Sequence, residues 1–95
     1  YREGIPRVLL EAGIYCKPSL ASNVPGCNDV VIDGYNGFLF EVRNKTDLIK
    51  KMQHFLELDN ISKAKLGSNA RKNVINNFSS QKVIKQYTQA IYNDY

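Results

Sequence analysis

The sequence predicts an α/β fold in which short parallel strands are followed by three helices. The sequence pattern changes near residue 44. The first half alternates short apolar runs with turn residues, and the second half is almost continuously helical in pattern. The resulting order of helix, strand, turn, strand and helices is typical of α/β proteins with parallel strands. Because parallel sheets need both faces covered, two short strands make a poor sheet. We therefore expect further strands upstream and interpret the chain as the last third of a doubly wound domain.

The first predicted helix covers residues 6–15, with the sequence PRVLLEAGIY. Proline is favoured at the first helical position, where its missing N–H would have had no partner, so Pro6 is expected to open the helix. Pro18 then prevents the helix from continuing, and residues 18–22 are typical of a short buried strand.

Turn residues dominate the middle of the chain. Pro25-Gly26 suits a type II turn, and a single helical turn is expected over residues 27–32. An Asp-Gly pair at 33–34 and an Asn-Gly pair at 36–37 bracket Tyr35 in a tight connection. Residues 37–40 then predict the second short strand.

Three helices are predicted beyond residue 44. Asn44 or Thr46 can cap the first, Asn60 the second, which runs to about residue 77, and Ser79 or Ser80 the third. Apolar residues at helical spacing define one face of each helix. They are Leu48, Ile49, Met52, Phe55 and Leu56; then Ile61, Ala64, Ala70, Val74 and Phe78; then Val83, Ile84, Tyr87, Ala90 and Ile91. His54 lies off the apolar face, which favours an exposed residue over a ligand.

Length and composition fit one small domain of ordinary globular type, with 95 residues, 43% hydrophobic and 23% charged. No apolar run approaches the roughly 18 to 20 residues that a membrane span needs. The polar start YREGIPR has no apolar signal-peptide core, and its abruptness leads us to expect that the natural N-terminus lies upstream. Cys16 and Cys27 match no zinc spacing, so reduced thiols in a cytosolic protein and no metal site are expected.

The net charge of +4 raises the question of anionic partners. Eight of the thirteen basic residues fall between Lys50 and Lys85, singly or in pairs, on predicted helices. Because no aromatic or glycine motif of a nucleic-acid module accompanies them, we expect no nucleic-acid partner. A solvated helical face is the favoured interpretation, and weak attraction to anionic lipid is the second.

The chemically informative stretch is YREGIPRVLLEA, residues 1–12. A helix that opens at Pro6 places backbone N–H groups without intrahelical partners at the positive end of its dipole, which suits a diphosphate. Gly4 lets a ligand approach the backbone closely. The carboxylate of Glu11 can accept two hydrogen bonds from a vicinal diol such as a ribose. A purely structural alternative takes Glu3 as an acid that complements the dipole and Glu11 as part of an exposed helix face.

These residues carry a resemblance to a known family. Glu3 and Glu11 form an E-x7-E pair, and EGIPRVLLEA is similar to the signature of the family-four retaining glycosyltransferases with the GT-B fold. Four later segments resemble that family in the same order and at matching spacings. They are KPSLAS at 17–22, NVPGC at 23–27, VVIDG at 30–34 and NGFL at 36–39. The resemblance covers residues 1 to about 58 closely and implies a partial Rossmann-like domain.

The resemblance implies a role for each matching residue. Glu3 corresponds to the catalytic glutamate that contacts donor-sugar hydroxyls, and Glu11 to the one that binds the ribose. The backbone N–H groups of Gly4 and Ile5, and of Arg7 and Val8, correspond to groups that face the sugar and the diphosphate. Binding without a metal or other cofactor is implied, because the helix dipole and basic side chains balance the phosphate charge. Departures at residues 13–16 and 28–29 fall on packing or turn positions.

The implied function is transfer of a glycosyl group, with retention, from a nucleoside-diphosphate sugar to a saccharide or lipid-linked acceptor in cell-surface glycan synthesis. A UDP-sugar is the expected donor. Residues 1–95 would be the C-terminal part of the donor-binding domain, inactive without the acceptor domain that is not in this sequence. A cytoplasmic location is implied, with possible peripheral attachment to the inner face of the membrane.

Two alternatives remain open. The first is a non-enzymatic interaction module that docks through its basic helices, for which charge reversal at Lys50, Lys51, Arg71 and Lys72 would abolish function. The second is a phosphoacceptor domain, which needs an acidic cluster at strand ends, whereas Asp29 and Asp33 lie in a predicted turn region.

Overall fold

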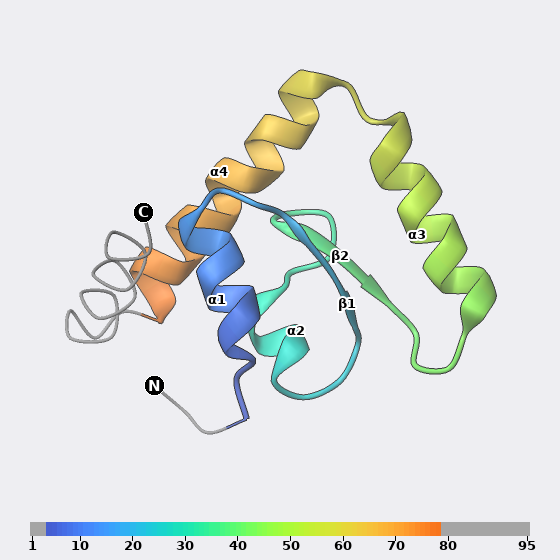
Figure 1. Cartoon of the computed structure of the whole chain (residues 1–95), viewed down its shortest axis with the longest axis horizontal. Coiled ribbons are helices and arrows are strands. Elements are labelled where there is room, and N and C mark those ends of the chain that lie inside the picture. Colours follow the sequence, from blue (N-terminus) through green and yellow to red (C-terminus); the bar gives the residue numbers. More distant parts are fainter. Residues whose placement is uncertain (1–3, 79–95) are drawn as a thin grey trace.

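Two short strands pair in parallel in a computed structural model that describes residues 4–78 (Figure 1). Strand β1 (Ser19–Ser22) lies beside β2 (Gly37–Phe40), with Ser19 opposite Gly37 and Ser22 opposite Phe40. A Cβ at Gly37 would overlap the carbonyl oxygen of Ser19, so glycine permits this close approach. The predicted bounds of β2 are confirmed. Strand β1 begins one residue later than predicted and is only half-buried, since Leu20 is 36% exposed.

Helix α1 (Arg7–Ile14) also begins one residue later than predicted. Pro6 has a helical φ of −65° but an extended ψ of 119°, so it is the N-cap residue and not the first helical one. The helix ends at Ile14 because Tyr15 is already its C-cap. Leu10 and Ile14 are buried and fix the inward face of the helix.

A turn and one short helix connect the two strands. Helix α2 (Cys27–Val30) is shorter than the predicted segment 27–32, because Val31 is extended at ψ 122°. Gly26 precedes it with φ 91°, the positive value that the third position of a type II turn requires. The Asp29 carboxylate accepts a hydrogen bond from the backbone N–H of Gly26 at 3.1 Å, which closes this turn.

Helix α3 (Lys45–Glu57) differs from the prediction in its burial. Asn44 caps it as predicted, accepting from the backbone N–H of Asp47 at 2.9 Å. Its apolar face is not part of the core, since no residue of Lys45–Glu57 is buried and Leu56 is 68% exposed. This face borders a groove against β1 and β2 of about 230 Å³, lined by Pro18, Ser19, Leu20, Phe38, Met52, Phe55 and Leu56.

Helix α4 (Asn60–Asn77) ends where predicted but begins with a different cap. The Asp59 carboxylate, not Asn60, accepts from the backbone N–H of Ser62 at 2.6 Å. The predicted inward face is correct at Ala70 and Val74, whereas Ile61 is 82% exposed. Leu66, Gly67 and Asn73 are buried in its place. The third predicted helix, from Ser79 or Ser80, lies outside the described residues.

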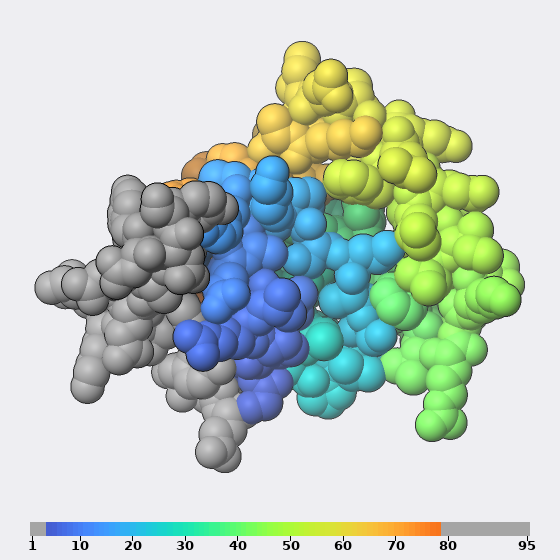
Figure 2. Space-filling view, in the orientation of Figure 1, coloured from blue at the N-terminus to red at the C-terminus, as the bar shows by residue number. Residues whose placement is uncertain are grey.

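The hydrophobic core lies between α1, α2 and α4, on the side of the strands away from α3 (Figure 1). Its buried members are Ile5, Leu10, Ile14, Val30 and Val74, with Leu9 and Phe78 packed against them. A Cβ at Gly13 would lie 2.5 Å from Cγ2 of Val74, and one at Gly67 would overlap the carbonyl oxygen of Cys16. Glycine at these two positions therefore lets α1 and α4 approach closely. The space-filling view shows β1 at the surface between α1 and the ridge formed by α3 (Figure 2).

Candidate functional site

The start of α1 lies at the carboxyl edge of the sheet. Helix α1 precedes β1 and runs back along it, so its first turn meets the turn that leaves β1 (Figure 1). This proximity is direct, because a Cβ at Gly26 would overlap the carbonyl oxygen of Gly4. In open α/β sheets, ligands bind in the crevice outside the carboxyl ends of the strands. The first of the predicted site residues, Gly4, is therefore at this edge of the sheet, and α1 leads from there to Glu11.

Gly4 and Ile5 have opposite environments. Gly4 is exposed at φ 89°, and a Cβ built on it would find no atom within 4 Å. Ile5 is only 5% exposed, and its side chain belongs to the core cluster. The buried Ile5 side chain thus fixes this segment, while the glycine leaves its backbone open on the solvent side.

The predicted residues of α1 share its solvent face. Glu11 lies three residues after Val8 and four after Arg7, which places its side chain beside both of theirs on the helix surface. Val8 is 68% exposed, whereas Leu10 on the opposite side is completely buried. The structure therefore brings Arg7, Val8 and Glu11 together on one accessible face beside Gly4. Glu3 lies outside the described residues.

Arg7 and Glu11 form an ion pair on this face, with Arg7 Nε 3.2 Å from Glu11 Oε1. Both side chains are accessible, at 65% and 41% exposure. A pair of this kind contributes about 0.5 kcal/mol or less, and the order with the cation N-terminal is the less favourable one. A polar ligand can therefore exchange contacts with Glu11 at little cost. A carboxylate also has more acceptor positions than this contact uses.

The N-terminus of α1 retains its electropositive character. The N-cap residue Pro6 makes no side-chain capping bond, and the first turn of the helix contains no acidic residue. Pro6 has no N–H to donate, and its carbonyl accepts from the backbone N–H of Leu9 at 3.1 Å. The dipole and the Arg7 guanidinium both favour an anion at this end.

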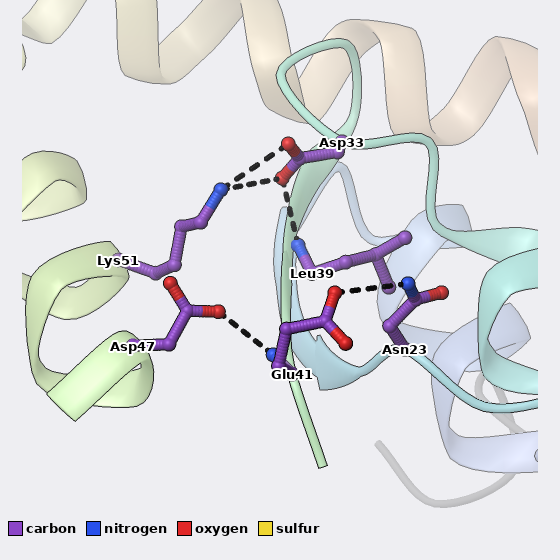
Figure 3. Close-up of polar contacts among 6 residues, drawn as sticks. All are labelled: Asn23, Asp33, Leu39, Glu41, Asp47 and Lys51. Carbon is purple, nitrogen blue, oxygen red and sulfur yellow. Dashed lines mark hydrogen bonds and ion pairs between the residues drawn. The ribbon is translucent and has the colours of Figure 1, made fainter. Parts of the chain in front are cut away.

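A network of polar side chains holds the neighbouring strand ends (Figure 3). Asn23 donates to Glu41 Oε1 at 3.4 Å, and Asp47 accepts from the Glu41 backbone N–H at 2.7 Å. Before β2, Asp33 accepts from the Leu39 backbone N–H at 2.9 Å and from Lys51 Nζ at 3.2 Å. Each of these carboxylates therefore has a structural contact.

Two of the four basic residues named for the docking alternative also have internal partners. The Arg71 guanidinium donates to the carbonyl oxygen of Ile14 at 2.6 Å and so closes the C-terminal end of α1. Lys51 pairs with Asp33 at 3.2 Å. Two of these four basic side chains therefore have structural roles within the chain.

One histidine and two cysteines lie outside the predicted site. His54 is exposed, as predicted, and lies edge-on to the Phe38 ring with centroids 5.1 Å apart. Cys16 and Cys27 are free. Residues 4–78 contain no cluster of three metal-ligating side chains, and none of the helices among them is both long and apolar enough to cross a membrane. Hydrogen bonds from the backbone and hydroxyl of Ser62 lower the pKa of Asp59, which caps α4 away from the site.

One contact beside the predicted site could not be predicted from the sequence. The pattern identified Pro25-Gly26 as a turn, but nothing in it indicated that Gly26 lies against the carbonyl group of Gly4. The turn alone already explained a glycine at position 26, because its third position needs a positive φ. The sequence therefore gave no indication that Gly26 is also needed for close packing.

Comparison with known proteins places these observations in a family. Residues 1–73 match the model of the glycosyl transferases group 1. The chain is 33% identical over all of its 95 residues to the capsular polysaccharide biosynthesis glycosyltransferase CapM of Staphylococcus aureus, of which it covers 24%. It is 30% identical, over 98% of its length and 25% of the relative, to the N,N'-diacetylbacillosaminyl-diphospho-undecaprenol alpha-1,3-N-acetylgalactosaminyltransferase of Campylobacter jejuni.

A solved structure has a similar fold. The crystal structure of Anabaena Alr3699/HepE in complex with UDP-glucose is similar over 98% of this chain, with a TM-score of 0.73 and 26% identity. The match covers 25% of that protein, so the chain spans about a quarter of the length of these relatives. The predicted fold, a partial Rossmann-like domain of the GT-B type, is confirmed.

Proposed function

This chain belongs to the glycosyl transferases of group 1, and we propose that it supplies part of the nucleotide-sugar site of a larger retaining enzyme. That enzyme, of family four, would transfer a glycosyl group from a UDP-sugar to a saccharide or lipid-linked acceptor in cell-surface glycan synthesis. The observation that best supports this proposal is the accessible face of Arg7, Val8 and Glu11 beside Gly4, at the carboxyl edge of the sheet. Similarity to a protein crystallised with UDP-glucose supports the choice of donor.

Each residue has a proposed task. The Glu11 carboxylate accepts hydrogen bonds from the two ribose hydroxyls, in partial exchange for its contact with Arg7. The helix dipole and the backbone at Gly4, Ile5, Arg7 and Val8 attract the diphosphate and the sugar. Glu3 contacts the donor sugar, a role that rests on the family resemblance alone. We expect no metal to be required, since these groups balance the phosphate charge.

Catalysis by such a site is electrostatic. As the bond between sugar and diphosphate lengthens, negative charge grows on the leaving diphosphate. Donors already aimed at that position stabilise the transition state more than the ground state and so lower the barrier. The proposed enzyme works in the cytoplasm, and its basic helices allow attachment to an anionic inner membrane face.

Calorimetric titration of UDP into the intact protein tests the donor site. Glu11→Gln removes the charge but keeps the shape, and we expect UDP affinity to fall about tenfold, or about 1.4 kcal/mol. Glu57→Gln at the far end of α3 is the matched control and should leave affinity unchanged. GDP-mannose and ADP-glucose, titrated alongside UDP-glucose and UDP-GlcNAc, identify the preferred nucleotide.

The ribose contact has its own test. If Glu11 binds the ribose diol, 2′-deoxy-UDP should bind the unmodified protein about as weakly as UDP binds Glu11→Gln. Combining both changes should then cost no more than either alone, because they remove the same interaction. Fully additive losses, or an unaffected Glu11→Gln variant, would overturn the proposed role.

A further inference from the structure

Gly26 is in van der Waals contact with the backbone of the proposed donor loop, Gly4 to Pro6. A Cβ at position 26 would overlap the Gly4 carbonyl oxygen and lie 3.3 Å from the Gly4 carbonyl carbon and 3.5 Å from Pro6 Cδ. Gly26 is buried, so its backbone forms the wall behind Gly4. No side chain fits between the two segments.

The turn that contains Gly26 is hydrogen-bonded to the sheet. The turn leaves β1 with the Asn23 N–H donating to the Phe40 carbonyl oxygen at 2.8 Å, so it is fixed to the end of β2 as well. Within the turn, the Val24 carbonyl accepts from the Asn28 N–H at 2.9 Å, and Asp29 holds the Gly26 N–H at 3.1 Å. The Gly26 backbone is therefore anchored independently of the donor loop.

The position that a side chain would occupy at Gly4 is open. Gly4 is exposed, and no atom lies within 4 Å of the position its Cβ would occupy. Gly4 thus has the Gly26 backbone against its carbonyl group and open space where a Cβ would stand. Since Gly4 at φ 89° has wide conformational freedom, something outside the residue must fix the direction of its peptide groups.

We propose that Gly26, held by Asp29, is a positioning residue that orients the Gly4–Ile5 backbone toward the diphosphate and sugar of the donor. This inference rests on the proposed function. It assigns the turn after β1 a role in donor binding although none of its side chains needs to touch the donor. A displacement of about 1 Å in groups that bind the reacting part of a substrate can reduce catalysis up to about a hundredfold.

The sequence offers a matched control for Gly26→Ala. Gly34 has nearly the same backbone conformation, with φ 80° against 91°, but a Cβ there would meet nothing within 4 Å. Alanine therefore introduces similar backbone strain at both positions. Only at position 26 does it also displace the Gly4 carbonyl group, so the difference between the two variants measures the contact.

The experiment compares the affinities of UMP and UDP for the intact protein by calorimetry. We expect Gly26→Ala to weaken UDP binding about tenfold while UMP binding changes little, because Gly4 faces the second phosphate and the sugar. Glu11→Gln should weaken both nucleotides equally, and Gly34→Ala neither. A general loss of folded protein would lower the binding stoichiometry for both nucleotides, so it cannot imitate this split.

Asp29→Ala keeps the test valid should Gly26→Ala fail to fold. It removes the acceptor that holds the Gly26 N–H without adding an atom, and the expected change is a smaller loss with the same preference for UDP. Asp33→Ala, which removes an acceptor for the Leu39 N–H at 2.9 Å, is its control. If Glu11→Gln weakens binding while Gly26→Ala and Asp29→Ala match their controls, the positioning role is wrong and the donor site stands. If Glu11→Gln has no effect, the proposed function fails first.

Discussion

The side-chain amides of Asn36 and Asn73 donate to the same acceptor, the carbonyl oxygen of Val30, at 2.9 and 2.8 Å. Both side chains are buried, at 3% and 5% exposure, and they come from the connection before β2 and from α4. Asn36 also accepts from the Ile32 backbone N–H at 2.7 Å. The end of α2 is thus bonded through one carbonyl group to the nearby connection before β2 and to the distant helix α4.

We expect Asn36→Ala to lower the free energy of unfolding by about 2 kcal/mol, because it removes a buried bond to the Val30 carbonyl group and leaves the part-buried Ile32 N–H without its acceptor. Asn73→Ala should cost less, about 1 kcal/mol, since Asn36 still satisfies the Val30 carbonyl group. Asn69→Ala, which removes a more exposed bond to the Tyr35 carbonyl group at 2.8 Å, is the control. Urea denaturation measures all three. Equal losses for Asn36→Ala and Asn69→Ala would contradict the argument.

Gly67→Ala should destabilise the protein although alanine favours helices. The added Cβ would overlap the Cys16 carbonyl oxygen, and overpacking of this kind costs about 1 to 3 kcal/mol. The gain in helix propensity offsets about 1 kcal/mol of this. Ser68→Ala at the exposed neighbouring position is the control and should be neutral or slightly stabilising. Thermal unfolding midpoints measure the effect. An unchanged midpoint for Gly67→Ala would show that α4 can move away from the segment after α1 without cost.

Asp33 is expected to matter more for its backbone contact than for its ion pair. Lys51→Ala breaks a partly exposed pair and should cost about 0.5 kcal/mol or less. Asp33→Ala also removes the acceptor of the Leu39 N–H and should cost about 1 kcal/mol. Asp33→Asn keeps an acceptor oxygen and should recover most of that loss in a denaturation experiment. If all three variants were equal, the ion pair would be the dominant contact.

Acid should weaken α4 through Asp59, whose folded-state pKa is lowered by its hydrogen bonds to Ser62. A group with a depressed folded-state pKa contributes its full stability above its unfolded pKa and loses it as the pH falls through the folded value. We therefore expect the helix to lose stability only at strongly acidic pH. Asp59→Asn keeps a capping oxygen without titrating, so this part of the acid dependence should vanish. Carboxyl carbon shifts in an NMR titration report the pKa directly.

Much of the backbone could be predicted from the sequence because local signals decide it. Three such signals act within a few residues: the Asn-Gly pair at the start of β2, the cap at Asn44, and Pro18, which prevents α1 from continuing. The corresponding elements lie where expected. The small errors at Pro6 and Asp59 have one cause. A helix start is decided between adjacent residues, and two neighbouring polar residues such as Asp59 and Asn60 can both cap.

Burial was less predictable because it depends on what else is packed nearby. The apolar face of α3 has ideal helical spacing, yet its residues line an open groove since no further element of residues 4–78 covers Leu56 or Met52. Within the site, the exposed face of α1 follows from spacing alone. The contact between Gly4 and Gly26 joins residues 22 positions apart, so no local sequence signal could predict it.

The close fit of α1 on α4 has a mechanical consequence. Glycines at 13 and 67 and the bond from Arg71 to the Ile14 carbonyl group join these helices, whereas α3 has no buried residue to hold it. We therefore expect α1 and α4 to be more rigid than α3. We expect a displacement of α4 to be transmitted to the helix that carries Arg7 and Glu11, whereas α3 is attached to the β2 region through contacts such as the Lys51–Asp33 pair and is not packed on α1. Amide hydrogen exchange should record this division, with α3 exchanging early and α1 late.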